Sequence, residues 1–226
     1  MRVDEEGDDA RFYLLQARPL SQREDLKPRP IPADIPDEDK LLYLRRNVPS
    51  GRVRNIEYLV YVDPHRYHDW PLTSRFDVAR AVGRVNRALI GKTYILMGPG
   101  RWGSANIALG VPTKYAEISN AAMLIEIAMM REGYVPEVSY GTHFFQDLIE
   151  DDIAYAPLYP DEEGVIYRED FLRGSASVFP DLLPEPYYRV FDELIRVIHL
   201  PSVTGGRLAT AALNGETDEG LIYLKK

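Results

Sequence analysis

Short apolar runs alternate with polar stretches along most of this chain, and their lengths and spacing predict its secondary structure. Runs rich in β-branched and aromatic residues are typical of buried strands. Strands are predicted at residues 55–62, 92–97, 121–130, 153–158, 207–213 and 221–224. The run at 121–130 has few β-branched residues, so a helix is the alternative there. We favour a strand because Asn120 and Gly133 bound a compact run.

A helix is predicted between residues 74 and 91. Its apolar positions repeat at helical spacing and are Val78, Val82, Val85 and Leu89. Ser74 and Asp77 resemble a capping box, and Gly91 fits the position just beyond the C-terminal end. The arginines of this helix lie on its other faces, where we expect solvated side chains; they are Arg75, Arg80, Arg84 and Arg87. Further helices are predicted at 143–150 and 168–174.

Strands and helices alternate over residues 55–160, which favours an α/β (α+β) fold with a mixed sheet and flanking helices. The last 40 or so residues look richer in strands, and Asn214-Gly215 marks a turn between two of them. Prolines crowd residues 27–36 and predict an extended linker. Residues 11–15 read as a strand that could pair with residues 1–4 in a hairpin. The prediction is therefore a short segment 1–22, a linker 23–39 and an α/β domain 40–226.

Composition narrows the functional classes. The 226 residues are 45% hydrophobic and 27% charged, enough to bury an ordinary core. The net charge is −8, whereas proteins that bind nucleic acid usually carry an excess of basic residues, so nucleic-acid binding is not expected. The absence of cysteine excludes disulfides and thiolate metal sites. No apolar leader segment is visible at the N-terminus, and the longest apolar run is too short to span a bilayer, so a cytoplasmic protein without membrane contact is expected.

The most specific local signal is Phe-Tyr-Leu-Leu-Gln-Ala-Arg-Pro-Leu at residues 12–20. It is an apolar strand with a polar end, where Gln16 can donate and accept hydrogen bonds and Arg18 offers a fork for phosphate oxygens. From chemistry alone, an ordinary edge strand is the favoured alternative. The segment also resembles the signature that closes the ATP-grasp nucleotide-binding domain of phosphoenolpyruvate synthase and pyruvate phosphate dikinase.

That resemblance implies ATP-binding roles for Gln16 and Arg18, and ATP and Mg²⁺ as cofactors of the whole enzyme. It also implies a kinase-type transferase that relays phosphate through a histidine toward pyruvate or another acceptor. The upstream ATP-grasp lobe and the family's metal-ligating Glu would precede Met1. We therefore expect a fragment of a dikinase-like phosphotransferase, inactive alone, whose partner is the missing lobe. The alternative is a small-anion-binding or regulatory module without catalysis, and an oligomer is left open.

A glycine-rich segment follows the predicted strand at 92–97, with the candidate residues Gly98, Gly100, Arg101, Trp102 and Gly103. Its Gly-x-Gly-x-x-Gly spacing matches a dinucleotide fingerprint, but residues 109–112 would break the helix that this motif requires. A Walker A loop is excluded because no Gly-Lys-Ser/Thr follows. Two interpretations remain: a nest of backbone N–H groups that binds an anion, with Trp102 as a stacking wall, or a tight turn whose Trp102 fills the core.

Thr142 and His143 form a second candidate, because Thr142 fits the N-cap of the helix predicted at 143–150. A helix N-terminus favours anions, so His143 could bind phosphate or act as a base. The alternative is a buried histidine bonded to a carbonyl. If the preceding strands are parallel neighbours, Gly98–Gly103 and Gly141–His143 should meet at one sheet edge around a phosphate- or carboxylate-bearing ligand.

Two histidines flank a tyrosine in a Pro- and Asp-rich stretch. His65, His68 and Asp69 could supply metal ligands, but a surface loop is the favoured interpretation because three ligands in one loop seldom have the required geometry. No metal site is therefore predicted. Independent hydrolase chemistry also lacks support, since neither Gly-x-Ser-x-Gly nor His-Glu-x-x-His occurs.

Overall fold

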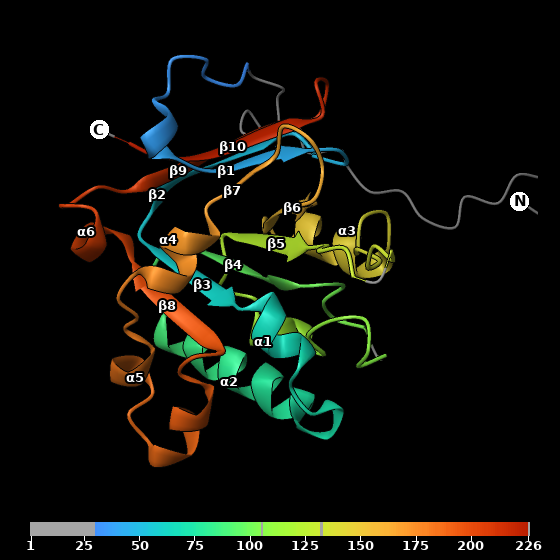
Figure 1. The fold of residues 1–226 in the computed structure, drawn as a ribbon, viewed down its shortest axis with the longest axis vertical. Coiled ribbons are helices and arrows are strands. Elements are labelled where there is room, and N and C mark those ends of the chain that lie inside the picture. The colour runs from blue at the N-terminus through green and yellow to red at the C-terminus, as the bar shows by residue number, and fades with distance from the viewer. Residues whose placement is uncertain (1–29, 105, 132, 226) are drawn as a thin grey trace, which may run out of the picture.

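A computed structural model describes residues 30–104, 106–131 and 133–225 of the chain. It shows a mixed α/β architecture with two five-stranded sheets that face each other. One sheet is mostly parallel, and helices cover its outer face (Figure 1). Segment 1–22, with Gln16, Arg18 and the predicted hairpin, lies outside the described residues.

The first sheet has the strand order β6-β5-β4-β3-β8. Its four parallel strands follow the order of the chain, and β8 adds an antiparallel edge beside β3. The strands are β3 Tyr58–Val62, β4 Tyr94–Pro99, β5 Met123–Ile127, β6 Ala154–Leu158 and β8 Ile195–His199. The carboxyl ends of β3, β4 and β5 therefore meet at one edge of the sheet.

The second sheet is antiparallel, with the order β2-β9-β10-β1-β7. Its strands are β1 Lys40–Arg45, β2 Gly51–Ile56, β7 Ile166–Tyr167, β9 Ala209–Asn214 and β10 Glu219–Leu224. The predicted C-terminal hairpin is confirmed, because β9 and β10 pair directly. Ile31 and Ile35, from the part of the predicted linker that the structure describes, pack on the outer face of this sheet.

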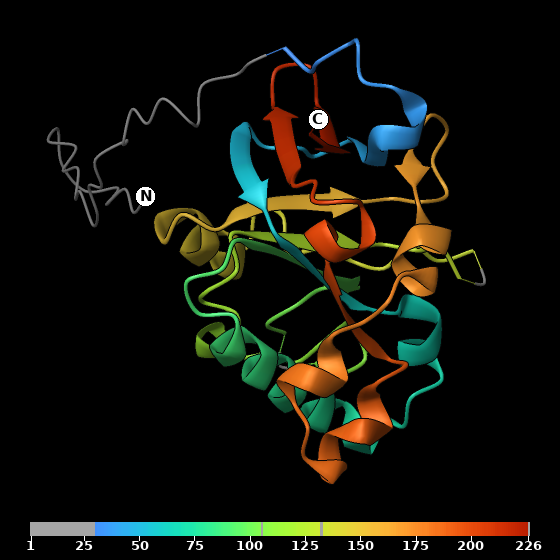
Figure 2. The same cartoon turned by 90° about the vertical axis from the view of Figure 1, so that its left-hand side faces the viewer.

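Most helices are short. The α-helices are α1 Pro64–His68, α2 Arg75–Ala88, α3 His143–Glu150, α4 Glu169–Gly174, α5 Phe179–Leu182 and α6 Leu200–Val203. The 3-10 turns are η2 Asp37–Asp39, η3 Leu72–Ser74, η4 Tyr115–Glu117 and η5 Pro186–Phe191. Helices α2 and α5 lie against the outer face of the parallel sheet in both views (Figures 1 and 2).

Two cores follow from the two-residue side-chain period of the parallel strands. Val60, Leu96 and Leu124 face the helices, whereas Leu59, Ile95 and Ile125 face the antiparallel sheet. Because both faces are covered, these strands are apolar at nearly every position. The burial of both faces explains why the strands appear in the sequence as continuous apolar runs.

Three sequence predictions need correction. The run at 55–62 is not one strand: the chain leaves β2 and enters β3 at Glu57, so its two halves belong to different sheets. The single mixed sheet is in fact two sheets. Arg75 is not solvated, since it is only 7% exposed, whereas Arg80, Arg84 and Arg87 are exposed as expected.

The run at 121–130 does contain a strand, β5. Helix α3 spans the predicted residues, with Thr142 as its N-cap. Over the described ranges, no helix is long and apolar enough to cross a membrane.

Candidate functional site

A pocket of about 210 Å³ opens at the carboxyl ends of β3, β4 and β5. Five chain segments form its walls: helix α1 after β3, the first residue of α2, the turn at the end of β4, the loop at 108–110, and the end of β5 with the stretch that follows it. The lining residues are Pro64, Tyr67, His68, Arg75, Pro99, Gly100, Ala108, Leu109, Gly110, Ile127, Met129, Arg131, Tyr134 and Pro136. Ligands of open parallel sheets bind at this edge.

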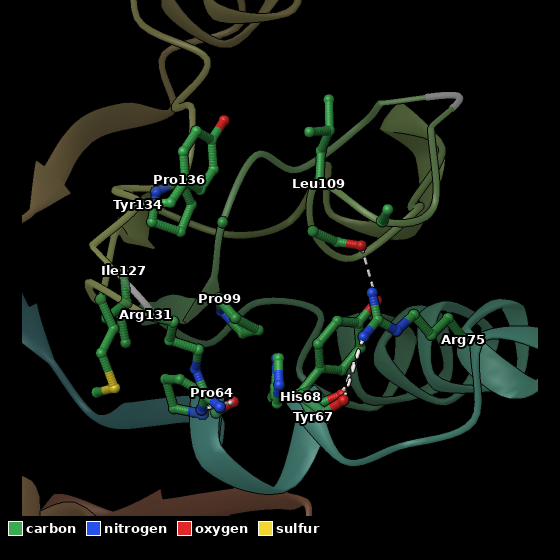
Figure 3. Close-up of a pocket in the computed structure, with 14 residues that line it drawn as sticks. Pro64, Tyr67, His68, Arg75, Pro99, Leu109, Ile127, Arg131, Tyr134 and Pro136 are labelled. Atoms are coloured by element: carbon green, nitrogen blue, oxygen red, sulfur yellow. Dashed lines mark hydrogen bonds between the residues drawn. The ribbon is translucent and has the colours of Figure 1, made fainter.

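The charged side chains in the lining of this pocket are arginines. Its lining holds Arg75, Arg131 and His68, and no Asp or Glu from the described part of the chain. In the view of Figure 3 the His68 imidazole lies between the two arginine side chains. The protein as a whole is acidic, so this concentration of positive charge is local.

Arg75 is held rigidly without a carboxylate. Its Nη1 donates to the Ile107 carbonyl at 2.9 Å, and its Nη2 lies 3.4 and 3.5 Å from the carbonyls of Tyr67 and His68. The guanidinium carbon lies 4.5 Å from the centre of the Tyr67 ring. Its buried Nε has no partner. A buried guanidinium balanced only by carbonyl dipoles and an aromatic face leaves a net positive field in the pocket.

Arg131 is the second arginine of the pocket lining. One of its Nη atoms donates to the Pro64 carbonyl at 3.2 Å, which fixes the guanidinium beside α1. The residue is half-buried, and no carboxylate lies within salt-bridge distance among the residues described. A guanidinium with unused donors at a pocket wall suits a carboxylate or phosphate oxygen.

The glycine turn (residues 98–103) packs against the loop at 109–111. The N–H of Gly100 donates to the Ile127 carbonyl, that of Arg101 to Leu109, and that of Gly103 to Val111. The Trp102 N–H donates to Glu126. All four amides from Gly100 to Gly103 are thus used by the protein itself, so the anion-nest interpretation of this turn finds no free backbone donor among them.

The positions of the side chains in the glycine turn also argue against an anion site there. Trp102 is completely buried in the helix-side core, which supports the alternative in which it fills the core. A Cβ on Gly98 would lie 2.7 Å from the Trp102 ring, so glycine at 98 makes room for the indole. Arg101 pairs with Glu137 at 3.3 Å on the surface. Of this turn, only Pro99 and Gly100 line the pocket.

The Thr142–His143 segment lies next to the glycine turn but outside the pocket lining. The Thr142 hydroxyl accepts from the Phe145 N–H at 3.4 Å, as its N-cap position predicts. His143 is exposed, which overturns the alternative of a buried histidine. The neighbouring Phe144 ring would lie 2.6 Å from a Cβ on Gly103. The two segments therefore meet at one sheet edge, but neither Thr142 nor His143 lines the pocket.

Glu126 is the feature that sequence reasoning missed most clearly. It is the next-to-last residue of β5 and is fully buried, yet its carboxylate accepts four hydrogen bonds. Oε1 accepts from the Trp102 N–H at 2.8 Å and the Ser139 hydroxyl at 2.6 Å. Oε2 accepts from the Ser139 N–H at 2.5 Å and the Tyr155 hydroxyl at 2.8 Å. Burial raises the pKa of the Glu126 carboxyl, and these donors oppose that shift.

Sequence signals for the missed residues exist but are weak. A lone glutamate inside an otherwise apolar strand is costly unless it is hydrogen-bonded, and Glu126 stands in such a run. Arg75 occupies the first helical turn, where a cation is unfavourable to the helix dipole and needs another reason to be present. Nothing in the local sequence distinguishes Arg131, because its role depends on the position of Pro64.

The histidine-bearing stretch forms α1, capped by the buried Asp63, which accepts from the N–H groups of His65 and Arg66. His65 pairs with Glu169 at 3.1 Å, and His68 faces the pocket. No cluster of three or more potential metal ligands occurs within the described residues.

Comparison of the chain with protein-family models finds no match, and comparisons with the curated proteins and with the solved structures find none either. The class of site is therefore defined by geometry alone: a small, positively charged pocket at the carboxyl edge of a parallel sheet.

Proposed function

We propose that the α/β region binds a small phosphate- or carboxylate-bearing ligand in the pocket at the carboxyl ends of β3, β4 and β5. The observation that carries this proposal is the charge of the lining: two arginines and a histidine, with no acidic side chain from the described residues. An anion would balance the buried Arg75 charge, which the protein leaves without a carboxylate.

The remaining lining suggests how such a ligand would be held. Tyr67 is buried and donates its hydroxyl proton to the Gly110 carbonyl at 2.7 Å, so it fixes the loop opposite Arg131. Burial raises the pKa of Tyr67, which keeps this phenol protonated. Leu109, Ile127 and Met129 supply apolar surface. The pocket volume of about 210 Å³ suits a compact ligand.

A thermal-shift titration with inorganic phosphate and with pyruvate tests the proposal. At a concentration about 100 times its Kd, a bound anion should stabilise the wild type by about 2.7 kcal/mol. We expect Arg131→Gln to lose most of this stabilisation because it removes the free guanidinium donors. Arg87→Gln on the exposed face of α2 is the matched control and should behave as the wild type. Equal stabilisation of both variants, or none in the wild type, would count against the pocket.

A second candidate function rests on the sequence at residues 12–20. We propose that the chain is part of a dikinase-like ATP-dependent phosphotransferase, in which Gln16 and Arg18 contact ATP phosphates beside Mg²⁺. The support is the resemblance of this segment to the end of an ATP-grasp domain. In such an enzyme the anion pocket would belong to an accessory domain.

The purified chain alone is expected neither to hydrolyse ATP nor to phosphorylate pyruvate, since an ATP-grasp site needs residues from a second lobe. A coupled ATPase assay with Mg²⁺ checks this. Turnover by the wild type that disappears in both Gln16→Ala and Arg18→Ala would show that the chain is active by itself and would overturn the expectation.

A further inference from the structure

We propose that Glu126 is the positioning residue of the anion pocket: its buried carboxylate holds two walls of the pocket at their working distance without touching the ligand. The inference rests on the proposed anion-binding function. Glu126 does not line the pocket, although its strand neighbour Ile127 does.

The two walls are the glycine turn and the strap, which we define as residues 128–131 and 133–139. The turn contributes Pro99 and Gly100, and the strap contributes Met129, Arg131, Tyr134 and Pro136. After Pro99, where β4 ends, the described residues of the turn and of the strap belong to no helix and to no strand of the parallel sheet. Their relative position therefore depends on specific contacts.

Glu126 accepts three of the buried hydrogen bonds that join these walls. One carboxylate binds the Trp102 N–H, two residues beyond Gly100, and both the N–H and the hydroxyl of Ser139, three residues beyond Pro136. The Ser139 hydroxyl also lies 3.3 Å from the Trp102 carbonyl. The Arg101–Glu137 pair links the same walls at the surface, where an ion pair contributes little.

The other end of the strap is fixed separately. The Met130 N–H donates to Asp161 at 2.6 Å, and Arg131 and Tyr134 exchange backbone hydrogen bonds within the strap. With its beginning held by Asp161 and its end held by Glu126, the strap presents Arg131 toward the pocket. Loss of the Glu126 contact would free the end of the strap next to Pro136 and Tyr134.

A carboxylate suits this position better than the isosteric amide does. Four donors converge on the two oxygens of Glu126, and a carboxylate accepts all of them. In Glu126→Gln the amide NH₂ would face one backbone N–H that cannot rotate: that of Trp102 if the NH₂ replaces Oε1, or that of Ser139 if it replaces Oε2. The variant therefore replaces one oxygen by an NH₂ group and disrupts the hydrogen bonds between the two walls, while the side-chain volume stays nearly the same.

The test compares Glu126→Gln with Ile125→Ala. Ile125 is the preceding residue of β5, is fully buried and faces the core between the two sheets. Its truncation therefore lowers stability but leaves the hydrogen bonds of Glu126 in place. Phosphate affinity is measured by calorimetry, and hydrogen exchange is measured at the Trp102 and Ser139 amides. We expect Glu126→Gln to weaken phosphate binding by about tenfold or more, as loss of supporting hydrogen bonds does at metal sites, and to accelerate exchange at both amides.

Ile125→Ala should keep its phosphate affinity within about threefold, since mutations without shared partners act independently. Equal loss of affinity in the two variants, or unchanged affinity in Glu126→Gln, overturns the proposal. If Glu126→Gln does not fold, Ser139→Ala takes its place, because it removes only the hydroxyl that bonds Glu126. It is expected to lose less phosphate affinity than Glu126→Gln. An unchanged affinity would contradict the proposed role of Glu126. If the wild type does not bind phosphate, the proposed function fails, and the exchange data alone decide whether Glu126 holds the two walls.

Discussion

Gly100→Ala is expected to lower the free energy of unfolding by about 3 kcal/mol or more, among the larger effects of a single substitution. A Cβ at this position would lie 1.9 Å from the Leu109 carbonyl oxygen and 3.3 Å from the Gly110 Cα. Both atoms belong to the backbone, so neither can rotate away. The φ angle of 63° adds the strain of the left-handed region. Chemical denaturation measures the loss.

Gly133→Ala is the matched control for this prediction. Gly133 has a φ angle of 79°, yet nothing lies within 4 Å of a Cβ placed there. It should therefore lose only about 1–2 kcal/mol, the cost of the left-handed conformation itself. Similar losses at the two positions would mean that the glycine turn and the loop at 109–111 are not pressed together as described.

Trp102→Ala is the second large effect, with an expected loss of about 3–5 kcal/mol. The indole is completely buried among helix-side core residues, and its removal leaves a cavity beneath the glycine turn. Trp102→Phe keeps an aromatic ring and should lose less. Ile90→Ala, at a side chain 66% exposed, is the control and should change stability by no more than about 0.5 kcal/mol.

The Trp102 series also separates the two interpretations of the glycine turn. A stacking wall in an anion site would give a small stability loss together with a loss of anion binding. If Trp102 is instead a core residue, its substitution gives a large stability loss, and the loss grows with the side-chain volume that is removed. Urea denaturation of the three variants distinguishes these outcomes, and near-wild-type stability of Trp102→Ala would contradict the buried position.

Helices could be predicted where neighbouring residues determine them, through a capping residue or through apolar positions at helical spacing. Helix α3 follows from Thr142 as an N-cap, and α2 follows from apolar positions at helical spacing. The existence of two sheets could not be predicted, because β2 and β3 form one continuous β-rich run and separate only at Glu57. Which sheet a strand joins depends on partners such as β9 and β8, which lie far along the chain.

Of the anion-site residues that the sequence suggested in the described part of the chain, only Gly100 lines the pocket. Glycines after β4 correctly marked the carboxyl edge of the sheet, because close backbone approach there excludes a Cβ. The charge that defines the pocket comes instead from Arg75 and Arg131. In the sequence these are two among 27 basic residues, and only the fold removes them from acidic partners. Glu126 was visible as a break in an apolar run, but its four donors come from three separate segments.

The most direct test of the anion pocket is a two-dimensional amide NMR titration of the wild-type chain with inorganic phosphate. Saturable shifts are expected at the amides of Gly100, Gly110 and Arg131 and at the Arg131 side-chain Nε–H, with little change at Gly205 and Gly206. These shifts should be absent in Arg131→Gln. Shifts that gather at Thr142 and His143 instead, or no saturable shift at any amide, would contradict the claim that this pocket binds the anion.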